Sequence, residues 1–95
     1  MQESKHWHNQ DAKKLFQAIL KLKTEAETAA FFRDLCTLEE LREMSKRFRA
    51  VRMLSQGQPY RTIAQKTGLS TATVTRVAHW LRHGEGGYQL LLKRI

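Results

Sequence analysis

The stretch from Pro59 to Arg82 constrains the fold of this chain more than any other part of the sequence. Near its middle stands Gly68, which can adopt the positive φ of a tight turn because it has no Cβ. Ser70 follows at a position where a hydroxyl can cap the start of a helix. Small and apolar residues recur at helical spacing on both sides of the turn, which predicts a helix-turn-helix. The small side chain of Ala64 lets the second helix approach the first, and the residues expected to hold the angle between the two helices are Ile63, Leu69, Val74 and Val77.

The second helix of this motif exposes a side that is shaped to enter a DNA major groove. An ordinary αα-hairpin with a glycine turn is the alternative interpretation. The residues that we predict for the DNA-binding surface are Gln65, Lys66, Ser70, Thr71, Ala72, Thr73, Thr75, Arg76 and His79.

The balance of charge also points to a polyanionic partner. The 95 residues include 17 Lys and Arg against 9 Asp and Glu, which gives a net charge of +8. From Ser45 onward the only acid is Glu85, so the basic half of the chain is the half that holds the motif. A basic run is often no more than a solvated face, but this coincidence favours double-stranded DNA as the partner.

Apolar periodicity predicts four further helices and no strand. The first is expected over residues 11–23. The others run from a capping box at Thr24 to about Leu35, from a second box at Thr37 to about Gln56, and over about Tyr88 to Lys93. The fold class is therefore all-α with six helices.

The length favours a single domain, which we place at residues 11–95 after a flexible arm over residues 1–10. His6 and His8 in the arm could ligate a metal, but no further ligands stand nearby. We favour a tethered arm that is anchored by Trp7.

Several classes of function find no support in the sequence. Cys36 is the only cysteine, which fits a reducing compartment, and no apolar run approaches the roughly 20 residues of a membrane span. We therefore expect a soluble cytoplasmic protein with no membrane partner. His79 and His83 have the spacing of a zinc pair without the rest of such a motif. No catalytic constellation stands out, and we predict neither an enzyme nor a metal or cofactor.

Apolar residues appear on more than one side of several predicted helices. Phe31 with Phe32, Met53 with Leu54, and the run 90–92 are examples. Because one small core does not cover all of them, we predict a homodimer, the commonest form of oligomer.

The order of several motifs resembles the tryptophan repressor superfamily, and most closely its YerC/YecD branch of TrpR-related proteins. The motifs are Phe31-Phe-Arg-Asp-Leu-Cys-Thr, Thr37-Leu-Glu-Glu, Ser45-Lys-Arg-Phe-Arg-Ala-Val, Gly57, Ser70-Thr-Ala-Thr-Val-Thr-Arg-Val and Gly87-Tyr88. This resemblance covers the chain from about Asp11 to its end. It implies an intertwined, all-helical homodimer with two helix-turn-helix heads, and a transcriptional regulator that binds operator DNA. Arg61, on the first helix of the motif, resembles a phosphate- or base-contacting position of the family and completes the predicted DNA-binding surface. The positions that resemble those approaching base edges are Thr71, Ala72, Thr73 and Thr75.

The resemblance also bears on a small-molecule effector. Arg47 and Arg76 align with the two arginines that sandwich the indole ring in the tryptophan repressor. Val77 stands where the repressor has a glycine, and Trp80 stands where it has a serine that serves the ligand's amino group. We therefore predict that tryptophan is not the corepressor. Trp80 either occupies part of the ligand's place or is a plain core residue.

Three functions compete at this point. The chain is a sequence-specific DNA-binding regulator, an architectural or accessory DNA-binding protein with little sequence preference, or a protein–protein adaptor that keeps the motif as a scaffold. The basic half disfavours the adaptor. Apart from Arg76, and Gln65 nearby, the second helix of the motif lacks side chains that read bases through paired hydrogen bonds, although threonines can contact thymine methyl groups or bind through water.

Overall fold

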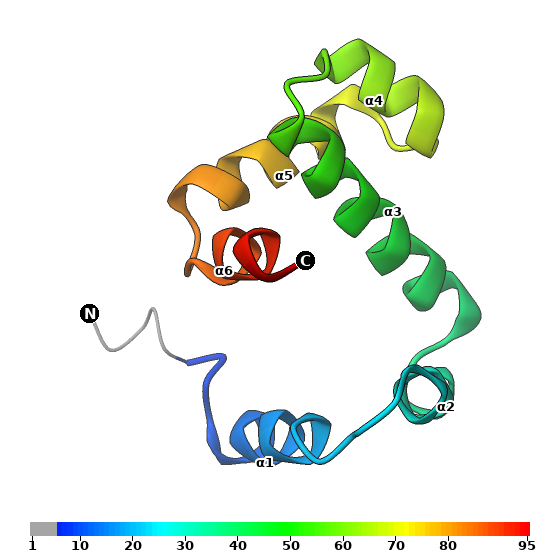
Figure 1. Cartoon of the computed structure of the whole chain (residues 1–95), viewed down its shortest axis with the longest axis vertical. Coiled ribbons are helices and arrows are strands. Elements are labelled where there is room, and N and C mark those ends of the chain that lie inside the picture. The colour runs from blue at the N-terminus through cyan, green and yellow to red at the C-terminus, as the bar shows by residue number, and fades with distance from the viewer. Residues whose placement is uncertain (1–5) are drawn as a thin grey trace. The chain divides into compact units, whose positions relative to one another are not determined.

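The computed structural model describes residues 6–95, and this part of the chain forms six α-helices and no strand (Figure 1). The helices are α1 (Gln10–Ile19), α2 (Glu25–Leu35), α3 (Leu38–Ser55), α4 (Tyr60–Thr67), α5 (Thr71–His83) and α6 (Gly87–Arg94). The predicted all-α class with six helices is confirmed. The chain separates into two compact units, of which the first ends at Thr37 and the second begins at Leu38. No helix within residues 6–95 is long and apolar enough to span a bilayer.

Helix α1 starts one residue earlier and ends four residues sooner than the helix predicted over 11–23. Asn9 begins it, because its side-chain oxygen accepts a hydrogen bond from the Ala12 N–H at 2.9 Å. The early end follows from the next helix: Thr24 must be extended, with φ −134° and ψ 162°, to act as the N-cap of α2. The preceding residues therefore turn the chain, and the Lys21 N–H donates to the Ala18 carbonyl at 3.0 Å.

The predicted capping of α2 is present with one change. The Thr24 hydroxyl accepts from the Glu27 N–H at 3.0 Å, as expected. The Glu27 carboxylate accepts a hydrogen bond from the Lys23 N–H at 2.9 Å. In an ordinary capping box the donor would be the N–H of the N-cap residue, Thr24, one residue later. Each of these bonds satisfies a backbone donor that no helical partner could reach.

The first unit has no fully buried side chain in either helix. Cys36, which ends α2, is only half-buried. Ahead of α1, the Trp7 ring stacks on His8 with centroids 5.3 Å apart, and it meets Phe16 edge-on at 6.3 Å. Residues 1–5 of the predicted arm lie outside the described residues, and Gln10, its last residue, belongs to α1.

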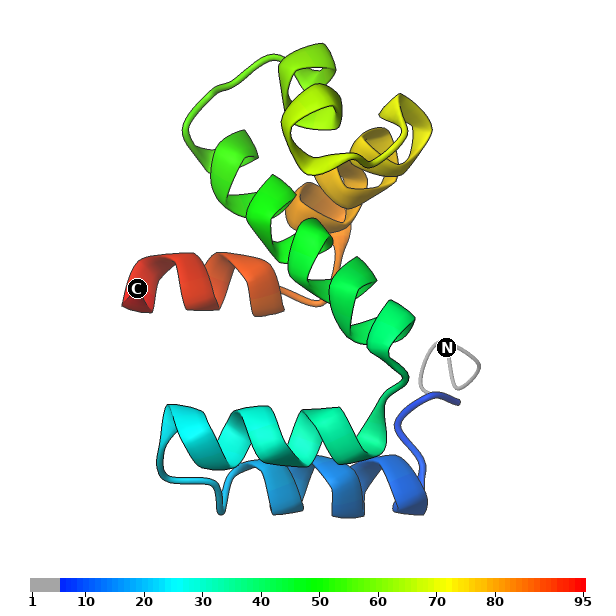
Figure 2. The same ribbon diagram turned by 90° about the vertical axis from the view of Figure 1, so that its right-hand side faces the viewer.

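The core of the second unit lies where α3, α4 and α5 meet, and α4 and α5 cross steeply near the C-terminal end of α3 (Figures 1 and 2). Its buried members are Ala50, Val51, Met53, Ile63, Leu69, Val74 and Val77. Tyr88 and Leu92 of α6 pack against this cluster. The predicted last helix and α6 agree within one residue at each end.

The turn between α4 and α5 has the geometry that its residues predict. Gly68 adopts φ +82° and ψ 2°, and its N–H donates to the Ala64 carbonyl at 2.9 Å. The buried Thr67 hydroxyl donates to the Ile63 carbonyl at 2.7 Å and accepts from the Leu69 N–H at 3.2 Å. A helix-turn-helix with a rigid connection therefore occupies residues 60–83.

Candidate nucleic-acid interface

Ser70 organises the start of α5. Its Oγ accepts from the Thr73 N–H at 3.0 Å and donates to the Thr73 Oγ1 at 2.9 Å. The Thr73 Oγ1 also accepts from the Arg76 Nη2 at 3.3 Å. Three residues that were predicted to face DNA thus form one network along the first two turns of the helix. Thr73 is half-buried, so Ser70 and Thr73 shape the surface more than they extend from it.

The remaining α5 residues differ in what they offer to a partner. The Thr75 hydroxyl donates to the Thr71 carbonyl at 3.0 Å, one turn back along the helix. Thr71 and Ala72 are exposed in the first turn, and the Thr71 hydroxyl has no protein partner within the described part of the chain. Thr71 is therefore the α5 threonine that is best able to hydrogen-bond to a base edge or a bridging water.

His79 lies farther along the exposed side of α5, among other rings. Its imidazole meets Trp80 edge-on at 5.1 Å and lies 5.2 Å from the His83 ring, centroid to centroid. No group of three His, Cys, Asp or Glu side chains within residues 6–95 could hold a metal ion. His79 is exposed and can approach a phosphate or a groove wall.

Helix α4 contributes an exposed polar row. Arg61 and Gln65 are one turn apart and both exposed, and Lys66 follows in the last turn. The Lys66 carbonyl accepts from the Arg49 Nη1 of α3 at 3.0 Å, which ties the end of α4 to α3.

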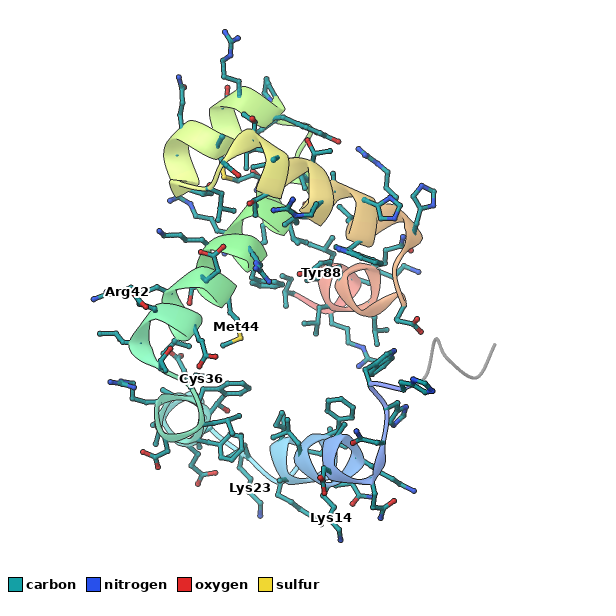
Figure 3. The ribbon with its side chains drawn as sticks, turned by 180° about the vertical axis from the view of Figure 1, so that it is seen from behind. Lys14, Lys23, Cys36, Arg42, Met44 and Tyr88 are labelled. Atoms are coloured by element: carbon teal, nitrogen blue, oxygen red, sulfur yellow. The ribbon has the colours of Figure 1, made fainter. Side chains whose placement is uncertain are left out.

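Two further cations, Lys46 and Arg49, lie beside the motif, and neither was among the predicted site residues. The Lys46 Nζ lies 3.7 Å from the place where a Cβ on Gly68 would be, so this amine borders the turn that leads into α5. Lys46 and Arg49 are three residues apart on α3, which places them in one surface row. The basic side of α3 is visible in the sequence, but its position beside the turn depends on how α3 packs on α4. Arg42 leaves α3 on the side opposite Met44 (Figure 3).

The residues that align with a ligand pocket do gather in one place. Arg47, Arg76, Val77 and Trp80, with Thr73 and Tyr88, line a hollow of about 120 Å³. The Arg47 Nε lies 3.6 Å from the Glu43 carboxylate, and Arg76 is held by Thr73. Val77 is buried, whereas Trp80 is 57% exposed, so Trp80 is not a core residue of its own chain.

A larger, mostly apolar hollow of about 490 Å³ adjoins this pocket. Its walls share Trp80 and Tyr88 with the smaller one, and Tyr88 lies at the start of α6 (Figure 3). The other residues that line it are Phe48, Gly84, Glu85, Gly87, Leu90 and Leu91. Leu90 and Leu91 remain about half-exposed, which leaves an apolar surface next to the ligand-like pocket.

The second unit is basic, and in it α5 follows the glycine turn after α4 and exposes one side. These features define this chain as a helix-turn-helix protein. Residues 10–95 match the model of the Trp repressor protein family, and the chain belongs to that family. It is 42% identical over 81 residues to the uncharacterized protein YerC of Bacillus subtilis (strain 168), and the aligned region covers 85% of this chain and 78% of YerC. The predicted relationship to the Trp repressor superfamily and YerC is confirmed.

Two crystal structures are similar to the whole fold. One is a TrpR-like protein from Eubacterium eligens ATCC 27750, with a TM-score of 0.87, 43% identity, and coverage of 93% of this chain and 91% of that chain. The other is a candidate Trp repressor from Staphylococcus aureus, with a TM-score of 0.85, 41% identity, and coverage of 90% and 86%. The Trp repressor family is a family of non-enzymatic, DNA-binding regulators. Membership in it indicates that this chain is a DNA-binding regulator.

Proposed function

We propose that this protein is a sequence-specific, repressor-like transcriptional regulator that acts in the cytoplasm as a homodimer and inserts α5 into the DNA major groove. The observation that carries the proposal is the first turn of α5. Thr71 and Ala72 are exposed there, immediately after a turn that is bordered by the Lys46 amine. Small side chains at the tip and cations at its edge suit a helix that enters a groove between two phosphate backbones.

The surrounding side chains divide into two roles under this proposal. Arg61, Lys66 and Arg76 are exposed cations that contact phosphates and set the register of the protein on the duplex. Thr71 and Ala72 approach base edges and carry the sequence preference. Ser70 and Thr73 keep the first turn of α5 in place through their mutual hydrogen bonds.

The proposed homodimer accounts for the apolar surface that one chain leaves uncovered. Helices α1 and α2 have no buried residue, and Leu20 and Ile95 are 82% and 70% exposed. The apolar hollow beside Trp80 adds to this surface. A second copy would cover these faces, and a two-fold dimer would present two reading heads to half-sites about one DNA turn apart.

We further propose that tryptophan is not a corepressor. The hollow between Arg47 and Arg76 measures about 120 Å³, below the roughly 300–1,000 Å³ of typical ligand pockets. Val77 and Trp80 take up space there, and Glu43 and Thr73 already engage the two guanidinium groups. Isothermal titration with L-tryptophan should give no saturable heat. Stoichiometric micromolar binding that tightens the affinity for DNA would show this part of the proposal to be wrong.

A second candidate function is an architectural or accessory DNA-binding protein with low sequence specificity. The observation in its favour is the makeup of α5. Two of its three threonines, Thr73 and Thr75, already use their hydroxyls in hydrogen bonds within the protein, and no Asn or Gln lies on this helix. Specific base readout would then fall largely on Thr71 and on water.

A competition titration separates the two candidates. A duplex is first enriched from a random-sequence pool by the protein and labelled, and unlabelled enriched and random duplexes then compete for the protein at fixed salt. The regulator predicts that the enriched duplex competes at least about 10³-fold better, the lower end of the range for specific binding. Equal competition by both duplexes would favour the accessory protein, and no binding to either would reject both candidates.

A further inference from the structure

Arg82 is joined to Tyr60 by a hydrogen bond that connects the two ends of the helix-turn-helix. The Arg82 Nη1 donates to the Tyr60 Oη at 2.9 Å, across 22 residues of sequence. Tyr60 is the first residue of α4, and Arg82 lies in the last turn of α5. Neither residue was among the predicted site residues.

The phenol that holds Arg82 is itself fixed. Tyr60 is half-buried and packs against the hydrophobic core cluster of the second unit. A long arginine side chain normally samples many rotamers, and binding a ligand must restrict them. Because the ring of Tyr60 is anchored, its hydroxyl holds one edge of the guanidinium in place and leaves the other donors of that group available.

The position of Arg82 on α5 matches that of a backbone anchor. Thr71 and Arg82 are eleven residues apart, so their directions around the helix differ by only about 20° and their positions along it by about 16 Å. The major groove is about 12 Å wide. A helix that places Thr71 at base edges therefore carries Arg82 beyond the base pairs, toward the phosphates that flank the groove.

We propose that Arg82 and Tyr60 form a phosphodiester-binding site, in which Arg82 contacts a DNA backbone phosphate and Tyr60 is the positioning residue that holds its guanidinium ready. The Tyr60 hydroxyl accepts from Arg82, so Tyr60 acts on the phosphate through the guanidinium that it holds in place. This inference rests on the proposed function and adds a contact that ties the orientation of α4 to that of α5 on DNA.

The test is a double-mutant cycle, measured as duplex affinity across a salt series with the enriched and the random duplex. R82Q should weaken binding to both and reduce the slope of log K against log salt by about 0.9, the value for one phosphate. Y60F should weaken binding to both about threefold to tenfold, since it removes one hydrogen bond to a charged group. In the R82Q background, Y60F should have no further effect, because Tyr60 acts through Arg82.

Matched variants make the outcomes decisive. R94Q removes a cation from the end of α6, away from the helix-turn-helix, and should leave the slope unchanged. R82K is a second test, because it leaves Tyr60 unchanged and keeps a positive charge at position 82. This variant should lower the affinity for both duplexes while the salt slope is retained.

Three results would overturn the inference: an unchanged slope in R82Q, unchanged binding in Y60F, or an equal loss from Y60F with and without Arg82. The last result would assign Tyr60 to core packing. If the wild-type protein bound no duplex at all, the proposed function would fail, and this inference with it. That failure is distinct from the other three, in which the wild type binds.

Discussion

Substitution of Gly68 by alanine tests the turn on which the reading head depends. A Cβ at this position would meet only the Lys46 Nζ, at an ordinary contact distance of 3.7 Å, so collision adds little. The penalty comes from the backbone, because Gly68 has φ +82°. A left-handed conformation is disfavoured in an L-residue by about 1–2 kcal/mol. For a domain of this size, each kcal/mol corresponds to a loss of about 4–8 °C in Tm.

Thermal unfolding followed by circular dichroism measures this loss, at one fixed protein concentration because a dimer would melt in a concentration-dependent way. Gly87 provides the matched control, since it lies in α6 and a Cβ there would meet nothing within 4 Å. Gly87→Ala should be neutral or stabilising by up to about 1 kcal/mol. Gly68→Asn should lose less than Gly68→Ala, because asparagine tolerates this conformation better. Equal Tm values for the alanine variants at Gly68 and Gly87 would refute the argument from the positive φ.

Three further predictions concern binding and assembly. Arg61→Ala should weaken binding to every duplex and reduce the salt slope by about 0.9 for the one phosphate that it releases; an unchanged slope would remove Arg61 from the phosphate contacts. Thr71→Ala combined with Thr75→Ala should leave Tm unchanged or higher, because β-branched residues disfavour helix, yet lower the discrimination between enriched and random duplexes. Lost stability with intact discrimination would make these threonines structural. Finally, Tm should rise with protein concentration, and a folded monomer in sedimentation at micromolar concentration would count against the dimer.

The parts of the fold that sequence reasoning predicted are those set by contacts between near neighbours in the chain. Gly68, Ser70 and Thr24 determine helix ends through hydrogen bonds that span three or four residues. The inward residues of the motif follow from helical periodicity in the same way. Both kinds of signal are local, and the structure bears them out.

The end of α1 shows where periodicity misleads. Apolar residues continue at helical spacing past Ile19, and Leu22 extends the pattern. The helix nevertheless ends at Ile19, because Thr24 must be extended to cap α2 and the chain needs several residues to turn. Competition between one helix and the N-cap of the next is not visible in the pattern of either helix alone.

The periodicity of apolar residues did not predict contacts between residues that are distant in the sequence. The hydrogen bond from Arg49 to Lys66 spans 17 residues and the one from Arg82 to Tyr60 spans 22. Both depend on the angles at which α3, α4 and α5 cross, and periodicity does not provide these angles. The four pocket residues were predicted to meet only because of the family resemblance, and the 57% exposure of Trp80 could not be read from its place in the helix.

The central claim, that the first turn of α5 lies against the bases of a DNA half-site, is tested most directly by cleavage from a tethered iron chelate. Cys36 is the only cysteine, so Cys36→Ser with Lys46→Cys carries a single attachment point beside the turn that leads into α5 and leaves Thr71 and Ala72 in place. On the enriched duplex we expect cuts in two short clusters about one helical turn, or roughly 10 base pairs, apart. Cys36→Ser alone should give no cuts. A uniform ladder of weak cuts from protein that is fully bound to the duplex would contradict the claim.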